Sequence, residues 1–286
     1  MKVLRHVAPG LLAMTFVSGG VAAAQAPAAP PAKGETPAVQ APFEPTVGQA
    51  GKDVVWVPTP EAVVEKMLDM AAVTADDYVM DLGSGDGRNI IAAAKRGATA
   101  VGVEYNPEMV ALSKKSAEAA GVAGKASFVQ GDMYEADISR ATVLALFLLP
   151  HNLDKLVPKF LALPPGTRIV GNTFSPAGWA ADESETISGD CTSWCTSLLW
   201  IVPARVEGKW GLPEGELDLG QEFQIVSGTI TSGNGKGEVK GKLRGDVITL
   251  YGGNLEYTGR VNGNTIEGTV KTTAGVTSPW RATRAQ

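Results

Sequence analysis

The chain has 286 residues, of which 44% are hydrophobic and 19% charged, with a formal net charge of −5. This length allows a well-buried core and one large or two modest domains. The acidic balance lacks the basic footprint of a nucleic-acid-binding protein, so we expect no nucleic-acid partner. The two histidines and two cysteines provide too few ligands for a zinc-type site, and no metal is expected.

The N-terminal region predicts export. Lys2 and Arg5 precede an apolar stretch over residues 11–24, and small residues that fit an A-x-A cleavage site follow. This layout predicts a secretory signal peptide over residues 1–26 and a periplasmic or envelope-associated protein. The apolar stretch is short for a span of about 20 residues, and an N-terminal anchor in the inner membrane is the alternative. Residues 27–50, rich in Pro and Ala, predict a flexible tether.

A domain is expected to begin near residue 51 with a helix, a strand and a glycine-rich loop. Thr59 and Pro60 suit a helix start, and apolar residues then recur at helical spacing. The strand 78–82 leads into a D-x-G-x-G-x-G loop. Its residues are Asp81, Gly83, Ser84, Gly85, Asp86 and Gly87. Glycines at a helix N-terminus let a ligand approach the backbone closely. Arg88 stands where a dinucleotide fingerprint has its third glycine, which argues against a dinucleotide.

Acidic residues follow the next two expected strands. Glu104 and Tyr105 come directly after an apolar strand over residues 98–103, and Asp132 and Met133 follow the strand 126–130. The carboxyl ends of parallel strands meet at one edge of a sheet, where ligands bind in open α/β folds. The glycine loop, Glu104 and Asp132 are therefore predicted to form one nucleoside-binding site, with Tyr105 and Met133 beside it.

The remaining elements up to residue 204 complete an α/β domain. A strand is expected over 141–149, a short helix end over 158–163 and another strand over 167–174. Strands and helices that alternate with short connections predict a doubly wound, mostly parallel sheet. Cys191 and Cys195 follow; an exported protein allows a disulfide between them, and two free, partly buried thiols are the alternative.

The composition changes near residue 205. Apolar–polar runs alternate there with Asn-Gly and Gly-Asp turns, for which Asn262-Gly263 is an example. Strand-like runs are expected over 222–231, 238–243, 247–251, 257–261 and 265–270. Residues 205–286 are therefore predicted to form a separate antiparallel β domain, a small barrel or sandwich. Its expected role is structural or in binding an envelope partner.

The motif D-x-G-x-G-x-G, with Glu104 and Asp132 at later strand ends, resembles motif I of the Rossmann-like methyltransferases that depend on S-adenosylmethionine (SAM). In that family the loop passes under the methionine part of SAM, the acid after the second strand binds the ribose, and a later acid lies near the adenine amine. The resemblance implies SAM as the cofactor and methyl transfer as the activity.

A narrower resemblance covers roughly residues 57–182. The V-P-T-P segment at 57–60, the G-D-G-R extension that ends at Arg88 and the L-L-P sequence at 148–150 are similar to bacterial relatives of the lysine methyltransferases that modify the ATP synthase c subunit and the adenine nucleotide translocase. This resemblance implies a protein lysine as a possible acceptor. The acceptor-pocket candidates are Leu149, Pro150, Trp179 and Asp182. Asn172-Thr173 depart from the polar pair common in relatives, which leaves the acceptor unidentified.

Two interpretations without turnover are the alternatives. In one, an exported module with this fold binds SAM or a related nucleoside. In the other, the chain is an envelope interaction protein whose β domain does the work. SAM is made in the cytosol, so an exported enzyme would lack an obvious supply of its cofactor. The intact glycines and acids favour an enzyme.

Overall fold

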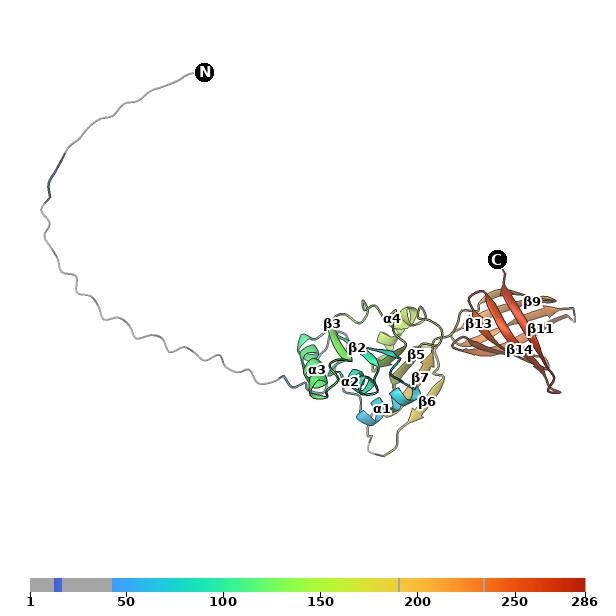
Figure 1. The fold of residues 1–286 in the computed structure, drawn as a ribbon, viewed down its shortest axis with the longest axis horizontal. Helices are drawn as coiled ribbons and strands as arrows, with labels where there is room; N and C mark the ends of the chain where they lie inside the picture. The colour runs from blue at the N-terminus through green and yellow to red at the C-terminus, as the bar shows by residue number, and fades with distance from the viewer. Residues whose placement is uncertain (1–12, 17–42, 190, 234, 286) are drawn as a thin grey trace, which may run out of the picture. The chain divides into compact units, whose positions relative to one another are not determined.

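The computed structural model describes residues 13–16, 43–189, 191–233 and 235–285 (Figure 1). Most of the predicted signal peptide and most of the predicted tether lie outside these residues, and both stay predictions. Among the described residues, no helix is both long enough and apolar enough to cross a membrane.

A seven-stranded sheet forms the first folded part, with the strand order β3-β2-β1-β4-β5-β7-β6. The strands are β1 (Tyr78–Leu82), β2 (Thr99–Glu104), β3 (Ala126–Gln130), β4 (Val143–Leu146), β5 (Arg168–Asn172), β6 (Glu183–Thr186) and β7 (Thr196–Ile201). Strands β1 to β5 pair in parallel, whereas β7 runs antiparallel to both β5 and β6. This confirms the predicted doubly wound, mostly parallel sheet.

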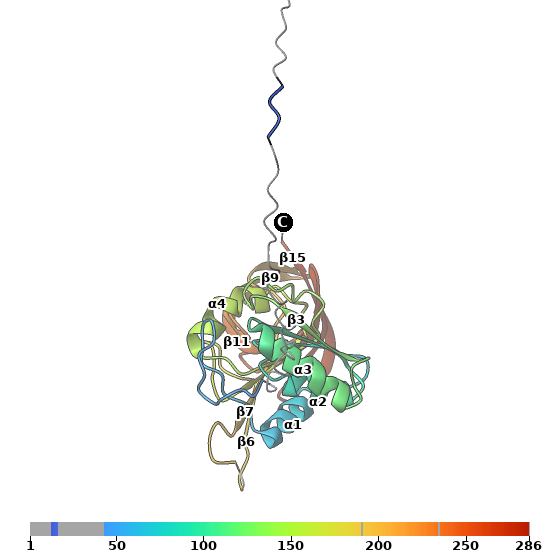
Figure 2. The same ribbon diagram turned by 90° about the vertical axis from the view of Figure 1, so that its left-hand side faces the viewer.

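Helices cover both faces of the sheet. They are α1 (Glu61–Met70), α2 (Arg88–Lys95), α3 (Pro107–Ala119) and α4 (Pro150–Phe160). Helices α1, α2 and α3 bury apolar residues in one core with Val79, Val143 and Val170, and Figure 2 shows these three helices next to one another. Helix α4 packs into a second core that contains Leu144, Leu146 and Ile169 of neighbouring strands. Successive side chains of a strand point to opposite faces of the sheet, so the sheet separates the two cores.

The segment after β4 differs from the sequence prediction. The predicted strand 141–149 is observed only over Val143–Leu146. Of the predicted helix end at 158–163, only residues 158–160 are helical, as the last residues of an 11-residue helix that begins at Pro150. Proline at the first helical position fits a helix start because its missing N–H has no intrahelical partner there. Leu148 is buried although it lies beyond the strand. The apolar run therefore extends past the end of the strand because residues beyond the strand are also buried.

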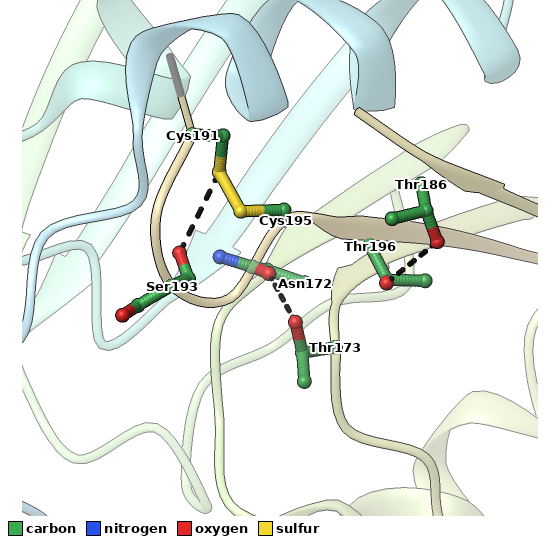
Figure 3. Close-up of a disulfide and its surroundings, with 7 residues drawn as sticks. All are labelled: Asn172, Thr173, Thr186, Cys191, Ser193, Cys195 and Thr196. Atoms are coloured by element: carbon green, nitrogen blue, oxygen red, sulfur yellow. Dashed lines mark hydrogen bonds between the residues drawn. A yellow bond between two sulfur atoms is a disulfide. The ribbon is translucent and has the colours of Figure 1, made fainter. Parts of the chain in front are cut away.

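The cysteines lie in the connection between β6 and β7, two strands that the sequence analysis did not predict. Cys191 and Cys195 form a disulfide with a Cα–Cα distance of 5.8 Å, which decides between the two alternatives left open (Figure 3). The backbone N–H of Ile187 donates to the Cys195 carbonyl, and the Thr186 and Thr196 hydroxyls lie 2.9 Å apart. The connection is therefore fastened at the base of the hairpin.

The C-terminal strands form a closed antiparallel barrel, drawn in orange to red in Figure 1. They are β8 (Gly208–Leu212), β9 (Gly215–Glu222), β10 (Ile225–Ser232), β11 (Gly235–Arg244), β12 (Val247–Gly252), β13 (Leu255–Asn262), β14 (Thr265–Thr272) and β15 (Thr277–Arg284). The antiparallel domain is confirmed as a barrel. Strands β8, most of β9 and β15 were not predicted, and pairing of β15 with β8 closes the barrel.

Side chains fill the barrel interior. Trp210, Leu217, Leu219, Val226 and Leu250 are buried there and alternate with exposed polar residues along their strands. A small barrel of eight strands is filled by its own side chains in this way. The expected envelope partner of this domain stays a prediction.

Candidate cofactor and acceptor site

A cleft of about 720 Å³, its open mouth included, lies at the carboxyl ends of β1, β2 and β4. It brings together Gly83, Glu104, Tyr105, Asp132 and Met133 of the predicted site. Further lining residues were not predicted: residues 49–57, Val103, Asn106, Met109, Gly131, Phe147 and Leu148. The cleft lies where ligands bind in open α/β folds.

The glycine loop borders this cleft through Gly83. Its φ of +78° lies in the left-handed region, and a Cβ placed on it would come within 3.5 Å of the Leu148 side chain. A side chain here would thus stand in the space between the loop and Leu148. Gly85 also has a positive φ and lies against the Trp56 indole, where an added Cβ would be 2.6 Å from Nε1. Both positions favour glycine because of their positive φ, and at Gly85 an added Cβ would in addition clash with the Trp56 ring.

Glu104 is held by backbone groups on both of its oxygens. Its Oε2 accepts from the Gly85 N–H at 2.9 Å, and its Oε1 accepts from the Asn106 N–H at 2.8 Å. The carboxylate therefore fixes the glycine loop to the end of β2 and remains at the wall of the cleft. Tyr105 projects beside it with 53% of its surface exposed.

Asp81 lies beneath the loop and does not line the cleft. Its carboxyl is 3% exposed; Oδ2 accepts from Asn89 Nδ2 at 3.0 Å, and Oδ1 has no partner among the described residues. Burial raises the pKa of Asp81 to about 8, and the nearby Glu104 and Asp86 act in the same direction. A cationic ligand above the loop would favour the ionised form of this carboxyl.

The other loop residues have structural positions. Ser84 is buried, and Gly87 directly precedes helix α2, where an added Cβ would clash with Phe128. Asp86 pairs with Arg88 at 2.5 Å, on the side of the loop that faces a separate groove. Arg88 also donates to the Thr59 carbonyl at 2.6 Å. The G-D-G-R extension thus joins the glycine loop to the V-P-T-P segment.

Residues 48–57 form a strap along the cleft. The Gly48 N–H donates to the Trp56 carbonyl, and the Trp56 N–H donates to the Gln49 carbonyl. Within this strap, Lys52 Nζ lies 3.0 Å from Asp132 and 2.9 Å from Asp53. Hydrogen bonds to Asp53 and Asp132 raise the pKa of Lys52. The Tyr134 N–H and Lys52 in turn lower the pKa of Asp132.

The acceptor-pocket candidates are not brought together. Leu149 precedes α4 and Pro150 is its first residue, directly after the cleft residue Leu148. Trp179 is buried, borders a separate apolar cavity with Leu148 and stacks on Phe223 at 5.2 Å. Trp179 therefore packs in the core and does not face the cleft.

Asp182 lies at the opposite edge of the sheet. Its Oδ2 accepts from the Ile201 N–H at 2.8 Å, and Ile201 pairs with Arg168 at the start of β5. The carboxyl ends of the strands lie at the other end of this pairing, where Asn172 faces Ser197. The predicted role of Asp182 in orienting an amine is therefore wrong. The prediction relied on the proximity of Asp182 to Trp179 in the sequence, which did not show that the chain turns back before β6.

Comparisons with known proteins show the family of this chain. Residues 81–183 match the family model of the ANTKMT methyltransferase domain. The chain is 49% identical over 133 residues to a protein-lysine N-methyltransferase of Saccharolobus islandicus, covering 46% of this chain and 83% of the relative. It is 33% identical to the lysine N-methyltransferase of the ATP synthase c subunit from Mus musculus, covering 56% of this chain and 63% of that protein.

A solved structure is also similar. It is an RNA methyltransferase from Salinibacter ruber in complex with S-adenosyl-L-homocysteine. The two sequences are 44% identical, and the match covers 52% of this chain and 96% of that chain with a TM-score of 0.49.

Proposed function

The chain belongs to the family of SAM-dependent methyltransferases that includes the protein-lysine N-methyltransferases, and we propose that it methylates the side-chain amine of a lysine in a protein. The identity with the archaeal protein-lysine N-methyltransferase, over 83% of that relative, is the observation that carries this proposal. The acidic net charge supports a protein acceptor over RNA, since phosphate binding calls for basic side chains.

The residues of the cleft fit SAM. Gly83 leaves open the space that a Cβ would fill, and the unpartnered Oδ1 of Asp81 lies buried below the loop. Glu104 would hold the ribose hydroxyls and Asp132 the adenine amine, beside the Tyr105 ring. When bound, SAM supplies a methyl group on a sulfonium, which a neutral amine can displace in line.

The acceptor side of the cleft is apolar and uncharged. Phe147 and Leu148 line it, and Phe174 stacks on Phe147 at 6.1 Å. An ammonium that enters such surroundings loses hydration, which lowers its pKa and favours loss of a proton to water. Phe147 and Leu148 would thus exclude water and hold the lysine stem, so that deprotonation requires no dedicated base.

Methyl transfer to lysine can be tested directly. We expect the purified chain to transfer tritium from methyl-labelled SAM to poly-L-lysine and to proteins of an envelope extract, with the label recovered as methyl-lysine after acid hydrolysis. Glu104→Ala serves as the inactive control, and total RNA as a competing acceptor. Label in RNA alone, or in another amino acid, would reject the proposal.

Lys52 should compete with the cofactor for Asp132. Its ammonium pairs with the carboxylate to which the adenine amine would donate. Both side chains of this pair are about a third exposed. Exposed pairs of this kind contribute little, so Lys52→Ala should tighten S-adenosylhomocysteine binding by at most about fivefold in calorimetry. Lys66→Ala, which removes a pair with Glu185, is the matched control. Weaker binding in Lys52→Ala would mean that the strap lysine helps to hold the cofactor.

We also propose that the protein works in an oxidising compartment. The signal-peptide pattern and the Cys191–Cys195 disulfide support this location, since disulfides persist mainly outside the cytosol. N-terminal sequencing of the protein from an exported fraction should begin near Gln25 or Pro27. Recovery only from the cytosol with both thiols free would contradict this location.

A further inference from the structure

Three aromatic rings meet at the acceptor side of the cleft. Phe147 follows β4, Phe174 follows β5, and Trp194 lies in the connection that leads into β7. The Phe147 and Phe174 rings stack at 6.1 Å with an interplanar angle of 10°, and Trp194 meets Phe147 edge-on at 6.1 Å. Because β7 is antiparallel to β5, its first residues lie at the carboxyl end of β5. The topology therefore brings Trp194 to the edge where the cofactor cleft opens.

Trp194 is exposed although it is a large aromatic residue. It keeps 41% of its surface accessible, whereas Trp179, Trp200 and Trp210 are buried. Its backbone φ of +53° lies in the left-handed region, which is unfavourable for a bulky side chain. Non-glycine residues in this region cluster at functional sites, where the surroundings hold them in place. An exposed indole in such a conformation, against a ring that lines the cleft, indicates a role in contacting a ligand.

The disulfide holds this conformation. Cys191 and Cys195 enclose Trp194 in a short covalent loop (Figure 3). The loop is fastened to β5 as well, since the Thr173 N–H donates to the Thr196 carbonyl at 2.7 Å. Thr173 itself has a φ of +62°, and its hydroxyl donates to Asn172 Oδ1. The hydrogen bond from Thr173 to Thr196 thus joins the end of β5 to the first residue of β7, two residues after Trp194.

Two described polar residues that precede Phe174 in the chain, Asn172 and Thr173, are neutral. Asn172 is 1% exposed, and its Nδ2 has no partner among the described residues. Figure 3 shows Asn172 and Thr173 next to the loop closed by the disulfide. Aromatic faces with uncharged neighbours attract an alkylammonium through cation–π contact and favour its desolvation. They offer no charge to fix a phosphate or a carboxylate.

We propose that Trp194, together with Phe147 and Phe174, forms the aromatic wall along which the acceptor lysine enters, and that the Cys191–Cys195 disulfide positions Trp194 for this contact. The inference rests on the proposed lysine methyltransferase function and deepens it. Trp194 is then a specificity-determining residue, and the two cysteines act through it as positioning residues.

The first test separates acceptor binding from cofactor binding. Trp194→Ala should raise the KM for poly-L-lysine by about three- to thirtyfold, the loss expected for one aromatic cation contact, whereas the Kd for S-adenosylhomocysteine changes less than twofold. Trp194→Phe should restore most of the wild-type KM. Tyr251→Ala, which removes an exposed ring from barrel strand β12, is the matched control and should leave both constants unchanged.

The second test addresses the disulfide. The double substitution Cys191→Ser and Cys195→Ser should raise the same KM, and so should treatment with dithiothreitol, which gives the disulfide two electrons and two protons and is itself oxidised to a cyclic disulfide. In the Trp194→Ala background neither change should add to the effect, because residues that act through one contact are non-additive.

The outcomes distinguish the two proposals. Wild-type protein that binds S-adenosylhomocysteine but methylates no lysine would reject the proposed function and this inference with it. An active wild type with an unchanged KM in Trp194→Ala would reject the inference alone. A KM increase on removing the disulfide that is equally large in the Trp194→Ala background would reject the positioning role of the cysteines.

Discussion

Replacing Glu104 by alanine should weaken SAM binding by about a hundredfold and abolish methyl transfer at micromolar SAM. The carboxylate has two tasks: it would bind the ribose hydroxyls, and it accepts the Gly85 and Asn106 N–H groups at 2.9 and 2.8 Å. Hydrogen bonds to a charged group contribute about 1.5–3 kcal/mol each, and tenfold in affinity corresponds to about 1.4 kcal/mol. Titration calorimetry of the variant with SAM measures the loss.

Glu108→Ala is the matched control for this prediction. Glu108 lies four residues further along, in the first turn of α3, and its side chain is exposed. Its substitution should leave the SAM affinity within about twofold, as expected for a surface change. The melting temperature of each variant separates lost binding from lost folding. Wild-type affinity in a folded Glu104→Ala variant would show that the nucleoside site lies elsewhere.

SAM binding should strengthen with rising pH up to about pH 8 through ionisation of Asp81. Burial raises the pKa of this carboxyl from 3.8 to about 8 in the cofactor-free protein, so it is mostly protonated at neutral pH. The sulfonium and ammonium groups of SAM interact favourably only with the ionised form. The association constant should therefore rise by up to about tenfold per pH unit below the pKa and then level off.

The stability of the cofactor-free protein should change in the opposite direction. Between about pH 4 and pH 8 the folded chain holds a proton on Asp81 that the unfolded chain has lost. The free energy of unfolding therefore falls as pH rises through this window, by several kcal/mol from this group. Denaturation at a series of pH values in the absence of SAM measures this slope.

Asp81→Asn tests both parts of this prediction. An amide can still accept from Asn89 Nδ2 but cannot ionise, so the variant should bind SAM more weakly at pH 8 and lose the pH dependence of both binding and stability. Asp137→Asn, a change at an exposed carboxyl, is the control. A wild-type pH profile that persists in Asp81→Asn would assign the titration to another group.

The glycine loop and Glu104, at the end of the second strand, show which part of the site follows from local sequence patterns. Gly83 and Gly85 adopt positive φ, and the period-two apolar strands place Glu104 at the same sheet edge. These features follow from backbone sterics and from the hydrophobic pattern, both of which act over a few residues. The parallel sheet and a ligand-binding glycine loop could therefore be predicted from the order of the residues, and the resemblance to motif I of the SAM-dependent methyltransferases added the cofactor class.

The acceptor side could not be predicted in this way. Asp182 is near Trp179 in sequence, yet the chain turns back into β6 and carries the Asp182 carboxyl to the opposite edge. Trp194 comes after that turn, and the antiparallel pairing of β7 with β5 brings it against Phe147, which lines the cleft. No local pattern encodes the direction of these two strands, because their pairing depends on which sheet edge is free after β5 is in place.

The sequence by itself thus determined the fold class and the positions of the glycine loop and of Glu104 at the end of β2, since close backbone approach and strand burial constrain residue types at fixed spacing. Only the tertiary structure decided that the strap with Lys52 lies along the cleft, that the last β strands close into a barrel, and that a disulfide-bound tryptophan meets Phe147. These are contacts between segments far apart in the chain. Their energies depend on packing and on loop closure, which residue order does not display.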